Sequence, residues 1–151
     1  MTELITRRLV LRTTDLSDAE VLAQLAQRES VDTYIGRLSV QREGSYLFTV
    51  LRKGTRLGQV SIIKSESPSG IEYEIVCALL PEAEGCGVAT EACKHALAWA
   101  CEEKALNRVL ARVHESNEPS AQLVSRLGMH AIGSDPEKHI TTYAWSCSPA
   151  T

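Results

Sequence analysis

Alternating apolar and polar positions predict strands in the first half of the chain and again near its end. In the first half, this pattern predicts strands over Ile5 to Leu11, Tyr46 to Leu51, Leu57 to Lys64 and Ile71 to Leu80. Three later segments have the same pattern: Arg108 to His114, His130 to Ile132 and Ile140 to Trp145. Lys53-Gly54 is a hairpin signal, and Ser65 to Gly70, which contains Pro68, is typical of a loop.

A helical period marks the segment that begins at Leu16-Ser17. Ser17 and Glu20 form a predicted capping box, and Leu16 is expected to pack on Val21. The apolar face continues to about Arg28. The segment that follows, Glu29 to Gly44, is short and mostly polar.

Two further helices follow the central strand. The main helix is predicted from Val88 to about Lys104. Its inward face consists of small residues, which suit close packing on a sheet: Ala89, Ala92, Cys93, Ala96 and Ala100. The last helix follows Ser116 or Asn117, either of which can cap it, and stops at Gly128.

The order of these elements predicts a mixed α/β sheet in a single domain over residues 1–151. Strands come first as a meander, and then a helix, a strand, a helix and a hairpin follow. Alternation places the side chains of the central strand on two faces. One face carries Tyr73, Ile75, Cys77 and Leu79, and the other carries Glu72, Glu74, Val76 and Ala78.

Composition narrows the functional classes. The formal net charge of −3 provides no basic field for nucleic acid or an anionic membrane, and no apolar run is long enough to span a bilayer. The N-terminus lacks a signal-peptide core, so a cytoplasmic protein is expected. The five cysteines are odd in number and include no Cys-x-x-Cys pair, which predicts reduced thiols rather than disulfides or a metal site. The four histidines have no ligand spacing, so no metal is expected.

The stretch from Glu74 to Ala92 joins the central strand to the main helix through a loop that contains Gly85 and Gly87. The first N–H groups of a helix have no internal partner, and the helix dipole favours an anion beside them. No Lys follows the glycines and no third glycine is present, which excludes the nucleoside-triphosphate and dinucleotide fingerprints. The loop is therefore either another kind of anion site or a tight turn that binds nothing.

This stretch resembles the acetyl-CoA site of the GCN5-related N-acetyltransferase (GNAT) superfamily, and it is nearest to the branch that acetylates N-termini of ribosomal proteins. The matching residues, in register and without a gap, are Glu74, Ile75, Leu79, Pro81, Gly85, Gly87, Ala89, Thr90, Glu91 and Ala92. Asn117-x-x-Ser120 and Leu127-Gly128-Met129 match two further motifs, and Arg7 to Arg12 resembles the first strand of the family.

The resemblance implies the GNAT fold, a mostly antiparallel sheet that splays apart at the cofactor site and is flanked by helices. It implies an enzyme that transfers an acetyl group from acetyl-CoA, its co-substrate, to a primary amine by direct attack. The acceptor would be a protein N-terminus or a small amine. Relatives usually have a second helix in the region of Glu29 to Gly44, so the wall around the acceptor is expected to be abbreviated here. Relatives can form homodimers, and the sequence does not show whether this chain does.

The resemblance also assigns residues to the cofactor. The CoA pyrophosphate is assigned to the backbone of Glu84, Gly85, Cys86, Gly87, Val88, Ala89 and Thr90. The pantetheine arm is assigned to the backbone of Val76, Cys77, Ala78 and Leu79, with the Cys77 N–H as donor to the thioester oxygen, and to Asn117. Glu84 departs from the family, whose members carry Trp, Arg or Gln at this position. A carboxylate here would repel a phosphate.

Three side chains are candidates for catalysis. An amine that attacks a thioester must lose a proton, and Glu74 is the predicted general base, with Glu72 on the same face as the alternate. The other interpretation of Glu74 is a solvated carboxylate that only orients the amine. Ser120 matches the serine that relatives place near the CoA sulfur, and its other interpretation is a first-turn serine that satisfies helix N–H groups. Val124 occupies the position of the tyrosine used by other branches, which excludes that variant.

Two competing functions remain open. Departures from the family at Val76, Ala78 and Glu84 suggest a CoA-binding sensor or subunit without catalysis. An α/β domain without any cofactor is the plainer alternative. A covalent route through Cys86 is not favoured, because no histidine with a recognisable partner motif accompanies it.

Overall fold

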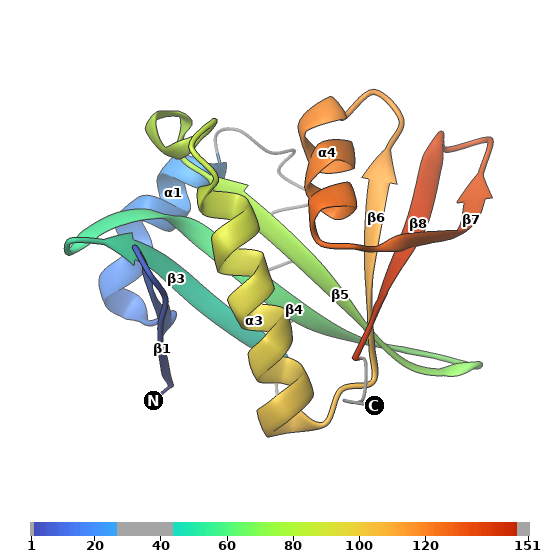
Figure 1. Ribbon diagram of the computed structural model, residues 1–151, viewed down its shortest axis with the longest axis horizontal. Helices are drawn as coiled ribbons and strands as arrows, with labels where there is room; N and C mark the ends of the chain where they lie inside the picture. The colour runs from blue at the N-terminus through green and yellow to red at the C-terminus, as the bar shows by residue number, and fades with distance from the viewer. Residues whose placement is uncertain (1, 27–43, 148–151) are drawn as a thin grey trace.

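Eight strands form one sheet in the computed structural model, which describes residues 2–26 and 44–147 (Figure 1). Their order across the sheet is β1-β2-β3-β4-β5-β6-β8-β7. The strands are β1 (Glu3–Ile5), β2 (Val10–Thr13), β3 (Tyr46–Arg52), β4 (Thr55–Ser67), β5 (Gly70–Leu79), β6 (Arg108–His114), β7 (His130–Asp135) and β8 (Ile140–Ser146). The described helices are α1 (Ala19–Ala26), α3 (Val88–Lys104) and α4 (Glu118–Arg126), with short 3-10 turns at Leu16–Asp18 and Pro81–Ala83.

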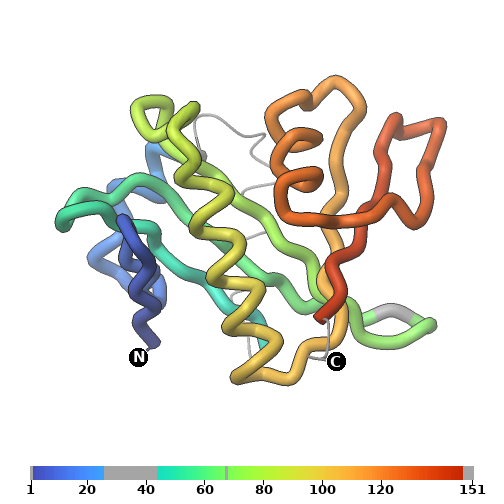
Figure 2. Tube along the Cα trace, viewed as in Figure 1, coloured from blue at the N-terminus to red at the C-terminus, as the bar shows by residue number. Residues whose placement is uncertain are grey.

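The sheet opens between β5 and β6. Within the described residues, every other neighbouring pair of strands is antiparallel, whereas β5 and β6 are parallel and share the single pair Glu74 and Leu110. Beyond that pair the two strands diverge towards the first turns of α3 and α4 (Figure 1 and Figure 2). The predicted mixed α/β sheet, mostly antiparallel and splayed, is confirmed.

Helices cover the two faces of the sheet. The main core lies between the sheet and α3, whose Ala92, Ala96 and Ala100 are fully buried and allow a close approach to the strands. On the opposite face, α1 forms a smaller cluster that includes Leu25 and against which Ala78 packs. The predicted alternation along β5 is therefore confirmed, because Ile75 contributes to the core beneath α3 while Ala78 faces α1.

Several predicted boundaries agree with the structure. The helix α3 and the strand β6 span the predicted residues, and Lys53 and Gly54 form the predicted hairpin turn with φ of 50° and 80°. Asn117, rather than Ser116, caps α4, and Gly128 ends that region with a φ of 75°. The strand β4 extends to Ser67 and β5 begins at Gly70, so the loop predicted over Ser65 to Gly70 is wrong except for its tip.

The first predicted strand is also wrong, because Ile5 to Leu11 is divided by a turn. The Thr6 N–H donates to the Leu9 carbonyl at 2.9 Å, which ends β1 and allows β2 to return antiparallel to it. The branched apolar residues on both sides of this turn produce one continuous strand pattern, and a turn closed by Thr6 leaves no glycine or proline as a signal.

The cap of the first helical segment differs as well. Asp15, not Ser17, is the cap, since its carboxylate accepts from the Ser17 N–H at 2.8 Å while the Asp18 carboxylate accepts from the Asp15 N–H at 2.9 Å. Leu16 is 94% exposed and does not staple the turn onto Val21. The residues expected to continue this helix, and the segment Glu29 to Gly44 apart from its last residue, lie outside the described residues.

Asp18 ties this first helical turn to the sheet. Its buried carboxylate pairs with Arg12 of β2 and Arg56 of β4, each at 2.7 Å. Burial opposes the charge on Asp18, but the hydrogen bonds from Arg12 and Arg56 outweigh it and hold the pKa of the carboxyl well below its usual range.

Glu91 ties the β1–β2 turn to the first turn of α3. Its carboxylate accepts from the Thr6 hydroxyl at 2.5 Å, from the Arg8 N–H at 2.9 Å and from Arg8 Nε at 2.7 Å. Burial opposes the charge, but the bonds from Thr6 and Arg8 outweigh it and lower the pKa of Glu91 to about 2. This motif residue therefore anchors the N-terminal hairpin beside the glycine loop.

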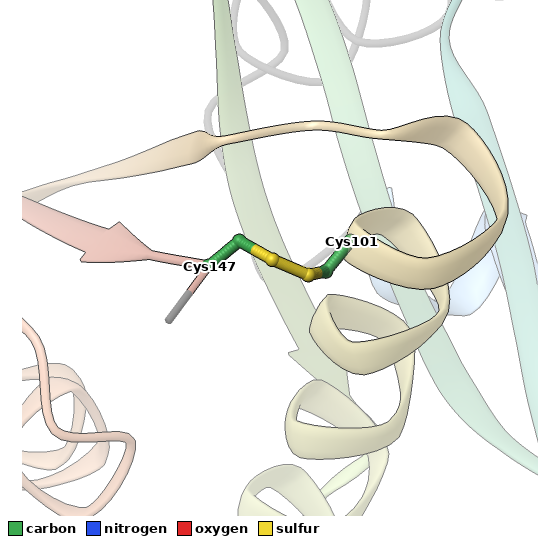
Figure 3. Close-up of a disulfide and its surroundings, with 2 residues drawn as sticks. All are labelled: Cys101 and Cys147. Carbon is green, nitrogen blue, oxygen red and sulfur yellow. A yellow bond between two sulfur atoms is a disulfide. The ribbon is translucent and has the colours of Figure 1, made fainter. Parts of the chain in front are cut away.

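Two cysteines form a disulfide, contrary to the expectation of reduced thiols. Cys101 in the last turns of α3 is bonded to Cys147 just after β8, with 5.7 Å between their Cα atoms (Figure 3). The Cys147 N–H donates to the carbonyl of Asn107, which lies between α3 and β6, so this strand pairing brings the two cysteines together. Cys77, Cys86 and Cys93 are free.

The anchor at Glu91 predicts a loss of stability in acid. Because the folded-state pKa of about 2 lies below the ordinary value of 4.5, the stabilisation is complete above pH 4.5 and disappears as the pH falls through about 2. Glu91→Gln should lower the free energy of unfolding by about 2 to 3 kcal/mol at pH 7 and by much less at pH 2.5. Urea unfolding at both pH values measures this, and an equal loss at both would contradict it.

The disulfide predicts a thiol count. Denatured, unreduced protein should show three reactive thiols with a chromogenic disulfide reagent, and five after reduction. Cys101 and Cys147 can react only once the disulfide between them is reduced. Cys147→Ser should lower the free energy of unfolding by about 2 to 4 kcal/mol under oxidising conditions. Five reactive thiols before reduction would contradict the disulfide and support the expectation that all five cysteines are reduced.

Candidate active site

The glycine loop leads from the 3-10 turn Pro81–Ala83 into α3. Gly85 and Gly87 have φ of 80° and 78°, the left-handed region that side chains disfavour. Gly87 is the N-cap of α3 and carries no side chain that could accept from the first turn. Glu91 is the first residue whose N–H returns to the helix, donating to the Gly87 carbonyl at 3.1 Å. The N–H groups that precede it are directed outward, as an anion requires.

Side chains hold this loop in shape. The Cys86 thiol donates to the Ala83 carbonyl at 3.2 Å, and Arg8 Nη1 donates to the Cys86 carbonyl at 2.9 Å. Arg8 thereby brings a positive charge to the loop from the N-terminal hairpin. Glu84 is exposed on the loop. The sequence pattern did not reveal the role of Arg8, because 78 residues separate it from Cys86.

The gap between β5 and β6 exposes backbone groups of β5. The Leu80 N–H donates to the Leu57 carbonyl on the β4 side. Because N–H and C=O groups of a strand alternate between its two edges, those of Cys77 are directed towards the gap. Within the described residues, β6 pairs with β5 only at Glu74, so no strand occupies that edge beside Cys77. This is the geometry expected for a strand that pairs with an amide-bearing ligand.

The two candidate carboxylates lie at the point where the gap closes. Glu72 and Glu74 both pair with Arg112 of β6, through Nη2 at 3.1 Å for Glu72 and through Nη1 for Glu74. Burial opposes the charge of Arg112, but the bonds to Glu74 and Glu72 outweigh it and raise the pKa of the guanidinium. Arg112 was not among the sequence candidates, because only the pairing of β5 with β6 shows what it contacts.

The first turn of α4 lies across the gap from the glycine loop (Figure 1). The side chain of Asn117 caps this helix by accepting from the Ser120 N–H at 3.2 Å. Since Asn117 provides the cap, the Ser120 hydroxyl is not needed for that purpose. Ser120 is half-buried in this turn. The arrangement favours a role for Ser120 outside helix capping.

Within residues 2–26 and 44–147, no group of three or more His, Cys, Asp or Glu side chains is arranged to hold a metal ion. In the same part of the chain, no helix combines the length and the apolar character that crossing a membrane requires.

Comparisons with known proteins agree with this fold. The acetyltransferase (GNAT) domain model matches residues 8–130. An acetyltransferase from Agrobacterium tumefaciens C58 has a similar structure, with a TM-score of 0.80 and 22% identity over 97% of this chain and 95% of that chain. No curated protein matches the chain significantly.

Two further solved structures carry named activities. Ribosomal-protein-S5-alanine acetyltransferase from Vibrio fischeri has a TM-score of 0.76 and 16% identity, with 97% of each chain covered. RimL, a ribosomal L7/L12 alpha-N-protein acetyltransferase in complex with coenzyme A, has a TM-score of 0.75 and 13% identity, with 95% of this chain and 96% of that chain covered. At these identities the likeness is one of fold. Because the domain model spans most of the chain, the chain belongs to the GNAT family of acetyltransferases, enzymes that transfer an acetyl group to an amine.

Proposed function

We propose that this chain binds acetyl-CoA in the gap between β5 and β6 and transfers its acetyl group to a primary amine held beside Glu72 and Glu74. The observation that carries the proposal is the single pairing of β5 with β6 at Glu74. It leaves the Cys77 backbone directed into the gap, with the outward N–H groups of α3 at one side and the first turn of α4 at the other.

The residues around the gap fit a CoA thioester. The backbone N–H groups from Gly85 to Thr90 would hold the pyrophosphate, with α3 contributing its dipole. Arg8, whose Nη1 already contacts the loop, places a guanidinium beside it. Acetyl-CoA would supply an acyl group already activated as a thioester.

At the thioester end of acetyl-CoA, backbone groups and side chains would have separate roles. The backbone of Val76, Cys77, Ala78 and Leu79 would pair with the pantetheine amides, and the Cys77 N–H would donate to the thioester oxygen as negative charge develops there. Asn117 would contact the same arm. Ser120, with its hydroxyl free of capping, would donate a hydrogen bond to the leaving sulfur.

Glu74 would accept the proton that the amine loses during attack, with Glu72 as the alternate. Both carboxylates stand at the closed end of the gap, where an attacking amine can meet the thioester. Glu74 is 28% exposed, which leaves it accessible to an acceptor or to a bridging water.

For the acceptor, we favour the free N-terminus of a polypeptide. Two solved neighbours act on ribosomal proteins, and the motif register is closest to that branch. We place the reaction in the cytoplasm on the same grounds. A second copy of the chain as partner is compatible with this proposal.

The loop assignment predicts the effect of a side chain at the helix N-cap. Gly87→Glu should abolish acetyl-CoA binding in calorimetry, because it places a carboxylate and a constrained backbone where the pyrophosphate would bind. Gly54→Glu is the matched control, since Gly54 has a similar φ of 80° in a hairpin away from the loop. Normal binding by a folded Gly87→Glu variant would refute the loop assignment.

The base assignment predicts a change in rate and in pH dependence. Glu74→Gln should lower turnover by about 10²-fold or more and flatten its rise with pH, because the amide cannot accept the proton. Thiol release from acetyl-CoA with a panel of peptides that have free N-termini measures this. Glu66→Gln, an exposed carboxylate on β4, is the control. Unchanged turnover in Glu74→Gln would reduce Glu74 to orienting the acceptor.

A further inference from the structure

We propose that Arg112 is a positioning residue that aligns the carboxylates of Glu72 and Glu74 to receive the acceptor as a primary ammonium group. This inference rests on the proposed function and adds a positioning residue to the same site. Arg112 lies on β6, whereas both carboxylates lie on β5, so it joins the two strands at the one place where they pair.

The geometry of the guanidinium fixes the carboxylates relative to each other. Its Nη1 donates to Oε1 of Glu74, and its Nη2 donates to Oε2 of Glu72. The planar fork of an arginine presents these donors in a fixed direction, which a lysine ammonium does not do. One side chain therefore sets the position of both carboxylates at the closed end of the gap.

Each carboxylate keeps one oxygen for a ligand. Among the hydrogen bonds of the described residues, Oε2 of Glu74 and Oε1 of Glu72 take part in none. The side chains of Glu74 and Glu72 are 28% and 34% exposed, so an incoming group can reach them. Two carboxylates and one guanidinium leave a net charge of −1, which matches one cation.

A primary ammonium group fits this arrangement better than a substituted one. It carries three N–H donors, so it can bond to both remaining oxygens and keep a third N–H for water. A dimethylated amine in its protonated form carries one N–H and can bond to only one of them. The pair of carboxylates held by Arg112 would therefore select acceptors with an unsubstituted amino group.

The chemical step balances in this arrangement. The ammonium group loses a proton to Oε2 of Glu74, and the freed nitrogen lone pair forms the C–N bond at the thioester carbonyl. The C–S bond breaks, and the sulfur leaves as a thiolate that is protonated to the thiol. A second proton leaves the nitrogen to water as the amide forms, so the products are an acetamide, CoA thiol and one released proton.

Among the described residues, few other charges face Arg112. Across the sheet, its neighbours on this face are uncharged: Ile63 and Ser65 opposite the carboxylates on β4, and Thr142 opposite Arg112 on β8. The next titratable group on the face is His114, two residues along β6, whose Nδ1 contacts the Ser116 hydroxyl at 2.7 Å. The helices α3 and α4 pack on the opposite face, against Val109 and Val113. Arg112 is therefore the main positive neighbour of both carboxylates in the described structure.

The test compares Arg112→Met with Arg112→Lys, using thiol release from acetyl-CoA with free-amino tetrapeptides between pH 5.5 and 9. Arg112→Met should raise KM for the peptide about 10-fold or more while KM for acetyl-CoA stays within about twofold. Arg112→Lys should recover part of the rise in peptide KM, because it keeps a positive charge but not the planar fork. Arg108→Met, on the same strand and exposed, should behave as wild type.

A second measurement tests the substrate class on the wild-type protein. A tetrapeptide whose amino group is dimethylated should inhibit acetylation of the unmodified peptide with an inhibition constant at least about 10-fold above the KM of that peptide. An inhibition constant equal to that KM would overturn the selection of primary ammonium groups.

The outcomes separate this inference from the proposed function. Absence of thiol release by wild-type protein with every peptide counts against the proposed function, and the inference falls with it. Thiol release by wild type combined with an unchanged peptide KM in folded Arg112→Met overturns the inference alone. If Arg112→Met does not fold, the peptide KM of Arg112→Lys is the deciding measurement, and a wild-type value in that variant overturns the inference equally.

Discussion

The candidate site depends on one constraint in the sheet: among the described residues, β5 and β6 pair only at Glu74 and Leu110. A sheet is normally held by backbone hydrogen bonds along the full length of each pair of strands, and a backbone group left without a partner inside a protein costs free energy. The divergence of β5 and β6 leaves no described strand beside the backbone of Cys77 on that edge. A ligand with amide groups could pair with this edge, which is why we propose the gap as the cofactor site.

The elements around the gap are fixed by contacts outside it. Small residues on α3 allow the helix to lie close to the sheet, and Glu91 locks the N-terminal hairpin to the first turn of that helix. Asp18 does the same for the first helical turn through Arg12 and Arg56. The backbone of the glycine loop is thereby held in place without using the N–H groups that an anion would need. At the closed end, the side chain of Arg112 bridges the two strands.

Local signals in the sequence were sufficient for much of this fold. The bounds of α3 follow from its helical period and the glycines before it, and β6 follows from its alternation. The positive φ of Gly85 and Gly87 agrees with the expected turn into the helix. These features depend on residues close together in the chain. The resemblance of the same stretch to a known family then supplied the fold, which the structure and the domain match confirm.

The features that sequence reasoning missed depend on contacts between distant residues. Arg112 meets Glu74 across 38 positions, and Cys101 meets Cys147 across 46, so neither pair leaves a local pattern. The turn after β1 was missed for another reason, because its closing residue, Thr6, also suits a strand. The assignments of site residues to acetyl-CoA and to catalysis remain predictions, although the geometry of the gap supports them.

Amide hydrogen exchange with and without acetyl-CoA tests the central claim most directly. If the gap between β5 and β6 binds the cofactor, the Cys77 amide and the amides from Gly85 to Thr90 should become protected together, while those of β1 and β7 should not change. Protection confined to other elements, or none at saturating acetyl-CoA, would contradict the claim that the opening of the sheet at Glu74 is the cofactor site.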